Sequence, residues 1–337
     1  FDQRRLELRD DYSFTVSQWG GEHSIQVGAN LDSLRYAVNK SQSGNPVFNF
    51  RNDPANGRTF DQPYEALYGF GNPRLNANNQ EYGIYGQDNW TVNSHLTVNL
   101  GLRYDYESNQ LDTSYVTPAN IAAALAGKVD PSYFSNGNNR NQYKNEIQPR
   151  VGFSYDLAGN GNTVIFGGAG RYYDRLFLNA TLDERYRLQF PVYRIEFSTD
   201  GRPGTIKFDP KYLSAAGLNA LVATGATNPE IYLLNNNTKP PYSNQWNIGV
   251  RQSFGKWNGS VSYDGVRGYN GFTWLSASGL CCQALVPGFG NVIISDREGK
   301  KYEYNALFLT LDRPYNNNWS AHLAWNHAKA TQNGNVL

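Results

Sequence analysis

The stretch HLTVNLGLRYDYES, residues 95–108, decides the fold class. Apolar side chains stand at every second position from Leu96 to Tyr106, and polar or small residues stand between them. Successive side chains of a β-strand point to opposite faces, so this stretch predicts one strand with an apolar face and a polar face. The eleven residues from 96 to 106 are about twice the usual length of a strand in a soluble protein. The rest of the sequence decides which face meets water.

The same alternation recurs along the chain and predicts strands in pairs. It is clear around residues 24–31, 151–157, 246–251 and 319–326. It is less clean around residues 82–90, where Asp88 falls in step with the apolar residues and is expected near a membrane edge or a bulge. Short connections rich in turn residues join the members of each pair, at Gly20-Gly21 and at residues 93–95, 160–162, 255–256 and 316–318. Such connections are typical of hairpin turns. The connections between the pairs are long, at about residues 39–80, 109–146, 176–241 and 269–302.

These features predict an all-β protein. Structureless connections of this length are rare inside compact domains, but they are expected on the outer side of an outer-membrane barrel, whose periplasmic turns are short. We therefore expect residues 1–337 to form a single domain: a transmembrane, antiparallel, up-and-down β-barrel segment of about ten strands with long extracellular loops. Residues 118–129 and 214–225 carry helix signals and are expected to be small helices packed on the loops.

Composition narrows the class of protein. The net charge of +1 argues against nucleic acid as a partner, because a nucleic-acid protein carries a concentrated basic face. The mean hydropathy is −0.61 and no run of 18 apolar residues occurs, which excludes a transmembrane helix but not a transmembrane barrel. The chain holds 24 Tyr and 7 Trp but no Met, and no signal peptide is visible. We expect it to be a mature piece or a fragment.

The aromatic residues are grouped by strand end. Trp19, Trp90, Trp257 and Trp319 lie beside the short turns. Tyrosines crowd the opposite strand ends, and we assign Tyr104 and Tyr106 to a second girdle there; the others are Tyr36, Tyr82, Tyr172, Tyr173 and Tyr242. Two aromatic girdles fit a bilayer with a wet interface on each side. The apolar strand face is therefore expected to contact lipid, and the polar face to line a lumen.

Several blocks resemble one family. They are EYGIYGQDNWTVNSHLTVNLGLRYDY (81–106), QPRVGFSYDLAGNGNTVIFGGAGRYYDR (148–175), PYSNQWNIGVRQSF (241–254) and YNALFLTLDRPYNNNWSAHLAWNHAKA (304–330), with HSIQVGANLDSLRY (23–36) before them. In this order they resemble barrel hairpins of TonB-dependent outer-membrane receptors of the Oar-like type. The resemblance runs over nearly the whole chain, and each motif alone is common.

The resemblance implies a 22-stranded barrel with a plug domain, driven by the TonB complex, that takes up a peptide, carbohydrate or chelate. Implied partners are outer-membrane lipid and lipopolysaccharide, TonB through the plug, and a possible surface protein. The sequence departs from the family in lacking a TonB box, a plug, a regulatory-like N-terminal domain and a final strand ending in an aromatic residue. We therefore expect these residues to be the middle of a longer polypeptide.

No catalytic constellation occurs, so we expect no enzyme activity, no metal and no cofactor. The four histidines lack a metal-binding spacing such as HExxH, and no nucleophile elbow, P-loop or dinucleotide fingerprint is present. Cys281 and Cys282 are adjacent and cannot join distant parts of the chain. They fit a structural pair in a loop, with a vicinal disulfide as one form, while a redox or metal role needs partners that are not nearby.

Candidate binding residues fall into two groups, each with two interpretations. Charged residues expected on the lumen face are Arg103, Asp105, Asp156, Arg171, Arg251 and Asp264. They either pair across the lumen or with a plug, or Arg103, Arg171 and Arg251 guide an anionic ligand. Loop aromatics, chiefly Tyr68, Trp274 and Phe289, either stack on a sugar or peptide or pack the loops against each other.

Three other functions compete with receptor and transporter. A structural or adhesion barrel would anchor a surface protein or assembly without transport. A passive porin would carry a constricting loop lined with charges, and residues 176–241 show no such cluster. The weakest rival is a soluble all-β protein.

Overall fold

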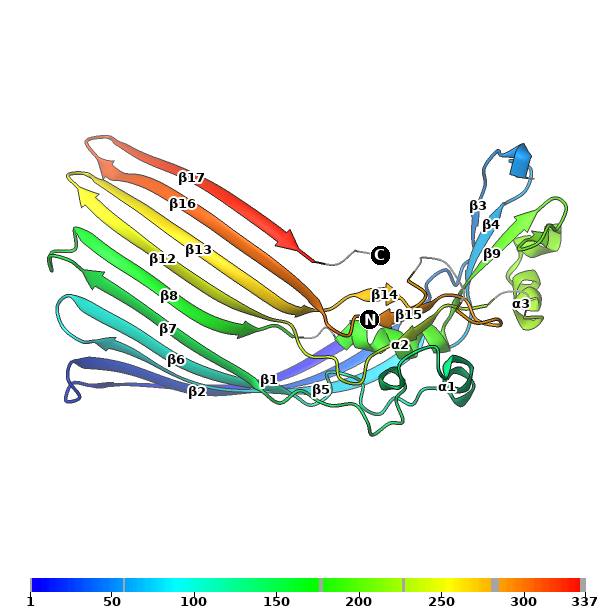
Figure 1. The fold of residues 1–337 in the computed structure, drawn as a ribbon, viewed down its shortest axis with the longest axis horizontal. Helices are drawn as coiled ribbons and strands as arrows, with labels where there is room; N and C mark the ends of the chain where they lie inside the picture. Colours follow the sequence, from blue (N-terminus) through cyan, green and yellow to red (C-terminus); the bar gives the residue numbers. More distant parts are fainter. Residues whose placement is uncertain (1, 57, 176–177, 226–227, 280–284, 334–337) are drawn as a thin grey trace.

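A computed structural model describes residues 2–56, 58–175, 178–225, 228–279 and 285–333. Its main feature is one ten-stranded antiparallel sheet (Figure 1). Each strand pairs with the next one along the chain, apart from short strands that belong to the long connections. In sheet order, the strands are β1 (Asp2–Val16), β2 (Glu22–Asn39), β5 (Arg74–Thr91), β6 (Leu96–Glu107), β7 (Glu146–Asp156), β8 (Thr163–Tyr173), β12 (Tyr242–Phe254), β13 (Trp257–Gly271), β16 (Lys300–Asn316) and β17 (Trp319–Gln332).

Five hairpins build this sheet, and their turns lie where the sequence predicts them. In the turn between β12 and β13, Gly255 has a φ of +62°, a conformation that carries no steric penalty for glycine. Asn317 and Asn318 adopt the same left-handed region in the turn between β16 and β17, with φ of +51° and +68°. Asn and Gly therefore specify these hairpins by backbone conformation.

The two faces of the sheet differ as the alternation predicts. Leu100 pairs with Val151, Val151 with Ala169, and Ala169 with Trp246, so these residues share one face, which we call the outer face. Leu100 is 46% exposed, and Leu323 on the same face is 62% exposed. Other exposed side chains of this face are Ile84, Leu102, Ile147, Ile248 and Trp325. Within the described chain, no second layer covers them.

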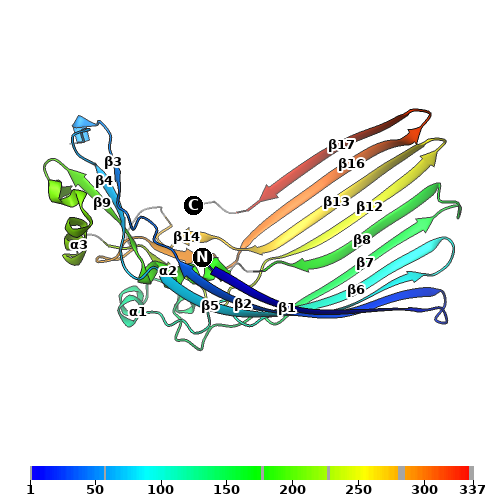
Figure 2. The ribbon, with the colours of Figure 1, turned by 180° about the vertical axis from the view of Figure 1, so that it is seen from behind.

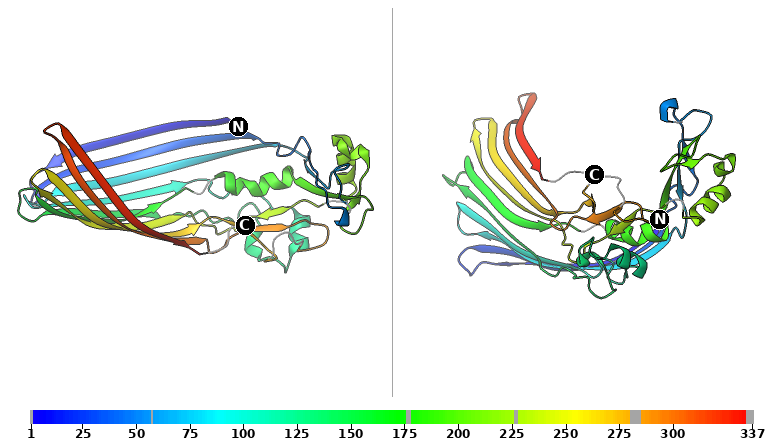
Figure 3. Two further views of the ribbon diagram at one scale, coloured as in Figure 1. Left: turned by 90° about the horizontal axis from the view of Figure 1, so that it is seen from above. Right: turned by 45° about the vertical axis from the view of Figure 1, so that its right-hand side comes forward.

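The inner face is the one that carries α2 (Leu178–Gln189). Leu178, Leu182 and Tyr186 of this helix pack near Tyr36 and Val38 of β2, whose side chains lie on the face opposite to Leu100. The sheet is curved like part of a barrel wall and remains open, with β1 and β17 at its two edges (Figure 2, Figure 3). Among the described helices, none has both the length and the apolar character needed to cross a membrane.

The long connections fold together at the end of the sheet opposite the short turns, into a unit that we call the cap (Figure 1). Two smaller sheets, each built from more than one connection, lie in it. One contains β3 (Val47–Asn49), β4 (Glu65–Gly69), β9 (Val192–Ser198) and β10 (Ile206–Lys207), and the other β11 (Ile231–Leu233), β14 (Trp274–Ser276) and β15 (Val292–Ser295). Its helices are α1 (Ala119–Leu125), α2, α3 (Ala215–Ala223) and the 3-10 turns η1 (Pro54–Asn56), η2 (Pro131–Tyr133) and η3 (Pro210–Leu213).

The buried apolar clusters lie in the cap and where it meets the sheet. One joins α1 to β11 and β15, and a second joins α3 to β4 and β9. The third packs α2 against the inner face of β2 and β5. The hydrophobic effect therefore holds the connections to one another and to the wall, while the outer face of the sheet stays uncovered within the described chain.

The helices α1 and α3 confirm the two that the sequence predicts. The Ser214 side chain accepts a hydrogen bond of 3.1 Å from the Gly217 N–H at the start of α3, and Gly225 follows its end with a φ of +71°. The helix α2 and the strands of the cap were not predicted. Leu178, Leu182, Tyr186 and Phe190 recur every four residues, and this helical stripe is the signal that marks α2.

The two-faced sheet predicts opposite effects for neighbouring substitutions in the full-length protein. Leu100→Arg puts a charge on the outer face near the middle of a span and should lower the free energy of unfolding in lipid by about 2–4 kcal/mol. Asn99→Arg, its matched control, puts the same charge on the inner face and should change it by much less. Urea unfolding in lipid vesicles measures both. Equal losses would contradict the assignment of faces.

Candidate functional site

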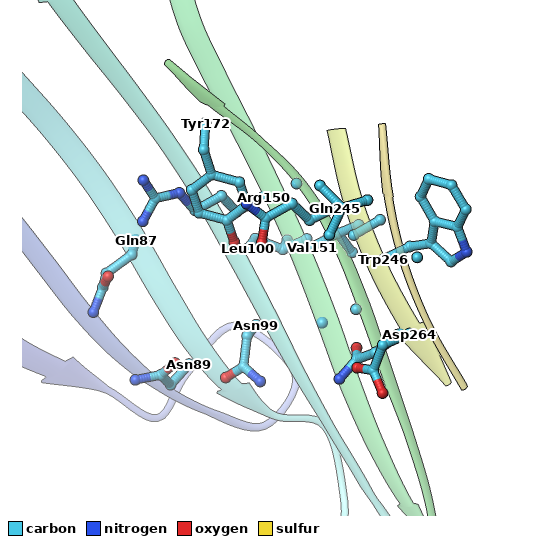
Figure 4. Close-up of a pocket in the computed structure, with 18 residues that line it drawn as sticks. Gln87, Asn89, Asn99, Leu100, Arg150, Val151, Tyr172, Gln245, Trp246 and Asp264 are labelled. Carbon is cyan, nitrogen blue, oxygen red and sulfur yellow. The ribbon is translucent and has the colours of Figure 1, made fainter. Parts of the chain in front are cut away.

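A shallow cavity of about 410 Å³ lies on the inner face (Figure 4). Its polar lining contains five amides, Gln87, Asn89, Asn99, Gln245 and Asn247, together with Arg150, Tyr172 and Asp264. Trp246, in contrast, projects to the other side of the sheet (Figure 4). Amides both donate and accept hydrogen bonds, so this part of the wall suits a polar ligand or a polar protein surface.

Glycines line the middle of this cavity. Gly152 of β7 pairs with Gly168 of β8, and Gly168 pairs in turn with Asn247. A Cβ atom at Gly168 would lie 3.1 Å from the Val151 carbonyl oxygen, which is tighter than ordinary contact. The FGGAG stretch (166–170) therefore serves close backbone approach within a strand.

Charged side chains replace the amides near the cap. Arg103 faces Asp105 with two hydrogen bonds, from Nε to Oδ2 at 2.8 Å and from Nη2 to Oδ1 at 2.6 Å. The same Nη2 donates to Asn30 Oδ1 at 3.1 Å. Arg103 lies on the inner face as expected, but its charge is neutralised inside the wall. This pairing favours the structural interpretation of Arg103 over ligand guidance, which stays a prediction.

Acidic residues outnumber basic ones around a small cavity of about 70 Å³ beside Arg103. Its charged lining consists of Glu81, Asp105, Glu107, Glu146 and Asp174 with Arg103 and Arg175. Neutral donors satisfy part of the excess, since Asn79 Nδ2 donates to Glu107 at 3.0 Å and Gln110 Nε2 donates to Glu146 at 2.5 Å. No group of His, Cys, Asp and Glu in the described ranges is arranged to hold a metal ion.

The three arginines proposed to guide a ligand do not share one site. Arg251 lies on the inner face of β12, three residues before the end of that strand at the short turn. Arg103 lies on β6 near the cap, so the two are at different depths. Arg171 pairs with Asn244, two residues from Trp246, and so lies on the outer face. The lumen assignment of Arg171 is wrong. Segment 163–172 is apolar on both sides in part, so hydrophobicity alone did not determine which face holds Arg171.

The other three charges expected in the lumen do lie on the inner face. Asp264 pairs with Asn247 in the ladder, and its Oδ2 accepts a hydrogen bond of 3.0 Å from Ser262 Oγ. Asp156 accepts a hydrogen bond of 2.6 Å from the Gly161 N–H at the β7–β8 turn. Asp156 therefore supports a turn, which is a structural role.

The loop aromatics pack the cap together. Tyr68 is 4% exposed, which favours loop packing over contact with a ligand. It lies in the cluster of α3, β4 and β9, and its hydroxyl donates to Asn219 Oδ1 at 2.7 Å. Trp274 makes edge contacts with Tyr232 and Phe272, at 5.1 and 5.2 Å between ring centroids. Phe289 packs on the α1 cluster. Ligand contact by Trp274 and Phe289 stays a prediction.

The helix α2 is the point where the connections meet. The Arg140 guanidinium of connection 108–145 contacts the Glu184 carboxylate, and both side chains are fully buried. Glu184 Oε1 also accepts a hydrogen bond of 3.0 Å from the Leu234 N–H. Arg185, the next residue of the helix, donates to Asp112 Oδ1 at 2.8 Å. A buried pair of this kind is costly to break, because the remaining charge is left without a partner.

Connection 40–73 reaches the same helix, and connection 272–299 reaches connection 174–241. The Tyr186 hydroxyl donates to the Lys40 carbonyl oxygen at 2.5 Å. On the other side of the cap, β11 pairs with β15, and the Asn235 N–H donates to Ser295 Oγ at 2.9 Å. Each of the other three connections is therefore tied by direct bonds to connection 174–241.

Burial affects the ionisation of the side chains around α2. It raises the pKa of Glu184 to about 7, although Arg140 and the Leu234 N–H favour the carboxylate. Burial also raises the pKa of Asp112 above its ordinary value, against the opposing effect of Arg185. The Tyr115 hydroxyl, beside Arg140, has its pKa raised by the same cause. Deprotonation is thus linked to opening of the cap.

The tryptophans of the expected turn-end girdle gather in two groups. The Trp90 ring stacks on His23 at 5.2 Å, its Nε1–H donates to the Gly20 carbonyl oxygen at 3.0 Å, and Trp19 lies edge-on to His23 at 5.9 Å. Trp257 and Trp319 contact each other at 6.0 Å. At the other strand end, Tyr106 stacks on Tyr82 at 6.2 Å, two residues along from Tyr104. Contact of these residues with lipid headgroups stays a prediction.

The Trp90 group also explains a break in the alternation. Asp88 lies on the outer face in step with Trp90, where a carboxylate is unfavourable in lipid. His23 Nδ1 lies 2.6 Å from Asp88 Oδ2, and His23 is 7% exposed. The pairing of β5 with its two neighbours is regular here, so no bulge is needed. The aromatic rings shield the pair at the turn end.

Sequence reasoning missed the residues that hold the cap. Arg140 stands in a polar stretch, SNGNNRNQ, that resembles a loop tip, and Glu184 stands on a helix that was not predicted. A contact between side chains as far apart in the sequence as positions 140 and 184 leaves no local signal in a single sequence. Cys281 and Cys282 lie outside the described residues.

Comparison with known proteins identifies relatives of the chain. A family model described as "Outer membrane beta barrel domain" matches residues 2–336. The TonB-dependent transporter Oar of Myxococcus xanthus is 29% identical over 97 residues, which is 29% of this chain and 7% of that protein.

Solved structures share the fold. The outer membrane transporter YddB of Escherichia coli matches with a TM-score of 0.60 at 13% identity, over 98% of this chain and 33% of that one. The siderophore receptor PirA of Pseudomonas aeruginosa matches with a TM-score of 0.53 at 13% identity, over 98% of this chain and 44% of that one. The chain thus spans less than half of the length of each of these relatives.

The raised pKa of Glu184 predicts that the cap loosens as pH rises. Between the ordinary glutamate pKa of 4.5 and the value of about 7 in the cap, the closed form keeps a proton that the opened form has lost. The free energy of opening should therefore fall across this interval and level off above it, and Asp112 acts in the same direction. Hydrogen exchange of the α2 amides in the full-length protein, corrected for intrinsic rates, measures the change.

Glu184→Gln is the matched variant, because glutamine keeps the size of the side chain and one of its two acceptor oxygens but does not titrate. It should flatten most of the dependence on pH. An unchanged pH profile in this variant would show that another group controls the opening.

Proposed function

The chain belongs to the outer membrane β-barrel domain family, and from this membership we propose that it supplies part of the wall and of the extracellular loops of a TonB-dependent receptor that takes up a ligand. The protein lies in the bacterial outer membrane. Its relatives are transporters and receptors, not enzymes. The cap then faces the outside of the cell, and the short turns face the periplasm.

One observation carries the proposal: a folded cap stands over the inner face of a wall whose outer face is apolar. The helix α2 packs on the inner face of β2 and β5, so part of the cap projects over the interior of the barrel. A receptor needs such a mouth to hold a ligand before transport. A wall lined by Gln87, Asn99 and Asn247 then offers exchangeable hydrogen bonds along the path.

The proposed sequence of events has three steps. The cap captures a peptide, carbohydrate or chelate from outside. A plug inside the complete barrel, pulled by TonB, then changes position. Finally the ligand passes along the polar inner face. In this scheme Arg103 and its neighbours near the cap stabilise the wall or contact the plug and do not bind the ligand, because Arg103 is already paired with Asp105.

A structural or adhesion barrel is the second candidate, and the internal packing of the cap favours it. The buried Arg140–Glu184 pair and two small sheets hold the cap together without a ligand. Exposed aromatic side chains remain on it, with Phe60 69% exposed and Phe50 46% exposed. Such a surface suits a protein partner held at the outside of the cell.

Binding to TonB distinguishes the two. The full-length protein, purified in detergent, should bind the isolated periplasmic domain of TonB from the same bacterium, because a receptor is coupled to it through the plug. Surface plasmon resonance measures the binding, with a porin of the same membrane as the control. No binding above the porin, together with a surface protein that is lost from cells lacking the barrel, would favour anchoring instead.

A further inference from the structure

The outer face carries an ordered set of polar and aromatic side chains near the cap, where the alternation alone predicts lipid contact. Three neighbouring strands supply it: β8, β12 and β13. In ladder order, one row contains Tyr173, Tyr242 and Tyr269, and the next row toward the turns contains Arg171, Asn244 and Arg267. Trp246 occupies the centre of the third row. The set is continuous across the strands, and we call it the arginine patch.

Asn244 lies directly between the two arginines. It pairs with Arg171 on one side and with Arg267 on the other. Neighbouring strands are about 4.8 Å apart, so the two arginine backbones are separated by roughly 10 Å. Arg171 Nε donates to Asn244 Oδ1 at 3.0 Å, which holds the first guanidinium toward the second.

Aromatic rings hold both guanidinium groups in place. The Arg171 guanidinium carbon, Cζ, lies 4.9 Å from the centroid of the Tyr242 ring. The Cζ atom of Arg267 lies 4.9 Å from the centroid of the Trp246 ring. Tyr242 itself stacks with Tyr269 at 5.0 Å and contacts Tyr173 at 5.2 Å. A guanidinium over an aromatic face keeps its edge free to donate hydrogen bonds.

The positive charge of the patch is only partly neutralised. Among the described residues, the contacts of the Arg171 guanidinium are with Asn244 and Tyr242, and neither is acidic. Arg267 Nη1 donates to the Val266 carbonyl oxygen at 3.0 Å, to the Tyr304 carbonyl oxygen at 3.3 Å and to Asn305 Oδ1 at 3.1 Å. Glu303 lies 3.6 Å from Arg267 Nε and is 58% exposed, which makes it a weak partner at the rim.

The depth of the patch places it at the outer interface of the membrane. Arg171 is eight residues beyond the start of β8, and Arg267 is ten residues beyond the start of β13. At about 3.3 Å per residue and a tilt of about 40°, these positions lie roughly 20–25 Å above the turn end. The hydrocarbon band of an outer-membrane barrel is of similar height, about 25 Å. The tyrosine row, one step farther toward the cap, fits the headgroup level.

We propose that the arginine patch binds the phosphate groups of a phosphorylated glycolipid of the outer leaflet, of the lipopolysaccharide class. Two guanidinium groups carried on strands roughly 10 Å apart can each meet one phosphate of a lipid that carries two. Tyr242 and Trp246 would contact its sugar and acyl parts, and the apolar strands below would contact its chains. The site faces lipid, so it does not belong to the transport path, and it rests on the membrane location alone.

Binding of purified lipid A to the full-length protein in detergent tests the proposal. Bisphosphorylated lipid A should bind the wild-type protein, and the double variant Arg171→Gln/Arg267→Gln should bind at least roughly tenfold more weakly, because it loses charge-assisted hydrogen bonds to phosphate. Arg251→Gln, which removes an arginine from the inner face, is the matched control and should bind as the wild type does. Native mass spectrometry counts the bound lipid.

Two further measurements keep the result interpretable. Arg171→Lys/Arg267→Lys keeps the charge and the fold, so it should bind between wild type and the glutamine variant, and a heat-modifiable gel shift confirms that each variant is folded. Dephosphorylated lipid A should bind the wild type as weakly as bisphosphorylated lipid A binds the glutamine variant. Equal binding of lipid A with and without phosphate, or by wild type and the glutamine variant, would overturn the proposal. So would displacement of lipid A by equimolar inorganic phosphate.

Discussion

Backbone hydrogen bonding in a medium without water is the constraint on which the rest of this structure depends. In lipid, a strand can leave no N–H or C=O unsatisfied, so spans must pair along their whole length. The ten strands do so in one continuous antiparallel ladder, and the regular pairing forces side chains to alternate between two faces. Each face then meets its own medium: Leu100 and Leu323 are exposed on the outer side, while Asn99 lines a cavity on the inner side. The edges at β1 and β17 must be paired before the sheet can lie in a bilayer.

The same constraint explains why the hydrophobic core lies outside the sheet. A wall one layer thick has nothing to bury its apolar face against except lipid, so the buried apolar clusters form where the connections meet. The cap is a folded unit in its own right, joined by sheets that draw strands from different connections and by the fully buried pair of Arg140 and Glu184. Such a cap can present a defined surface to a ligand, and it ties that surface to the inner wall through α2. Both properties suit a receptor.

Arginine side chains lie in three different environments in this protein. Arg103 is held by Asp105 within the inner wall, and Arg140 is buried in the cap. Arg171 and Arg267 lie over aromatic rings on the outer face, at the level where a bilayer changes from acyl chains to headgroups. The wall thus separates charges that serve the interior from charges that serve the membrane, and neighbouring positions on one strand can belong to different functions.

The period of two, the Asn and Gly turns and the turn-end tryptophans were enough to predict the sheet, its five hairpins and its membrane location, because these depend on local backbone preference and on the surroundings of each face. The helices α1 and α3 were also predictable from their end signals, and α2 could have been found from Leu178, Leu182 and Tyr186. Only the tertiary structure placed Arg171 on the outer face, buried Tyr68, and joined Arg140 to Glu184. In β8 both faces are partly apolar, so the pairing with β12 decides the face of Arg171. The other two depend on contacts between segments far apart in the chain, which a single sequence does not encode locally.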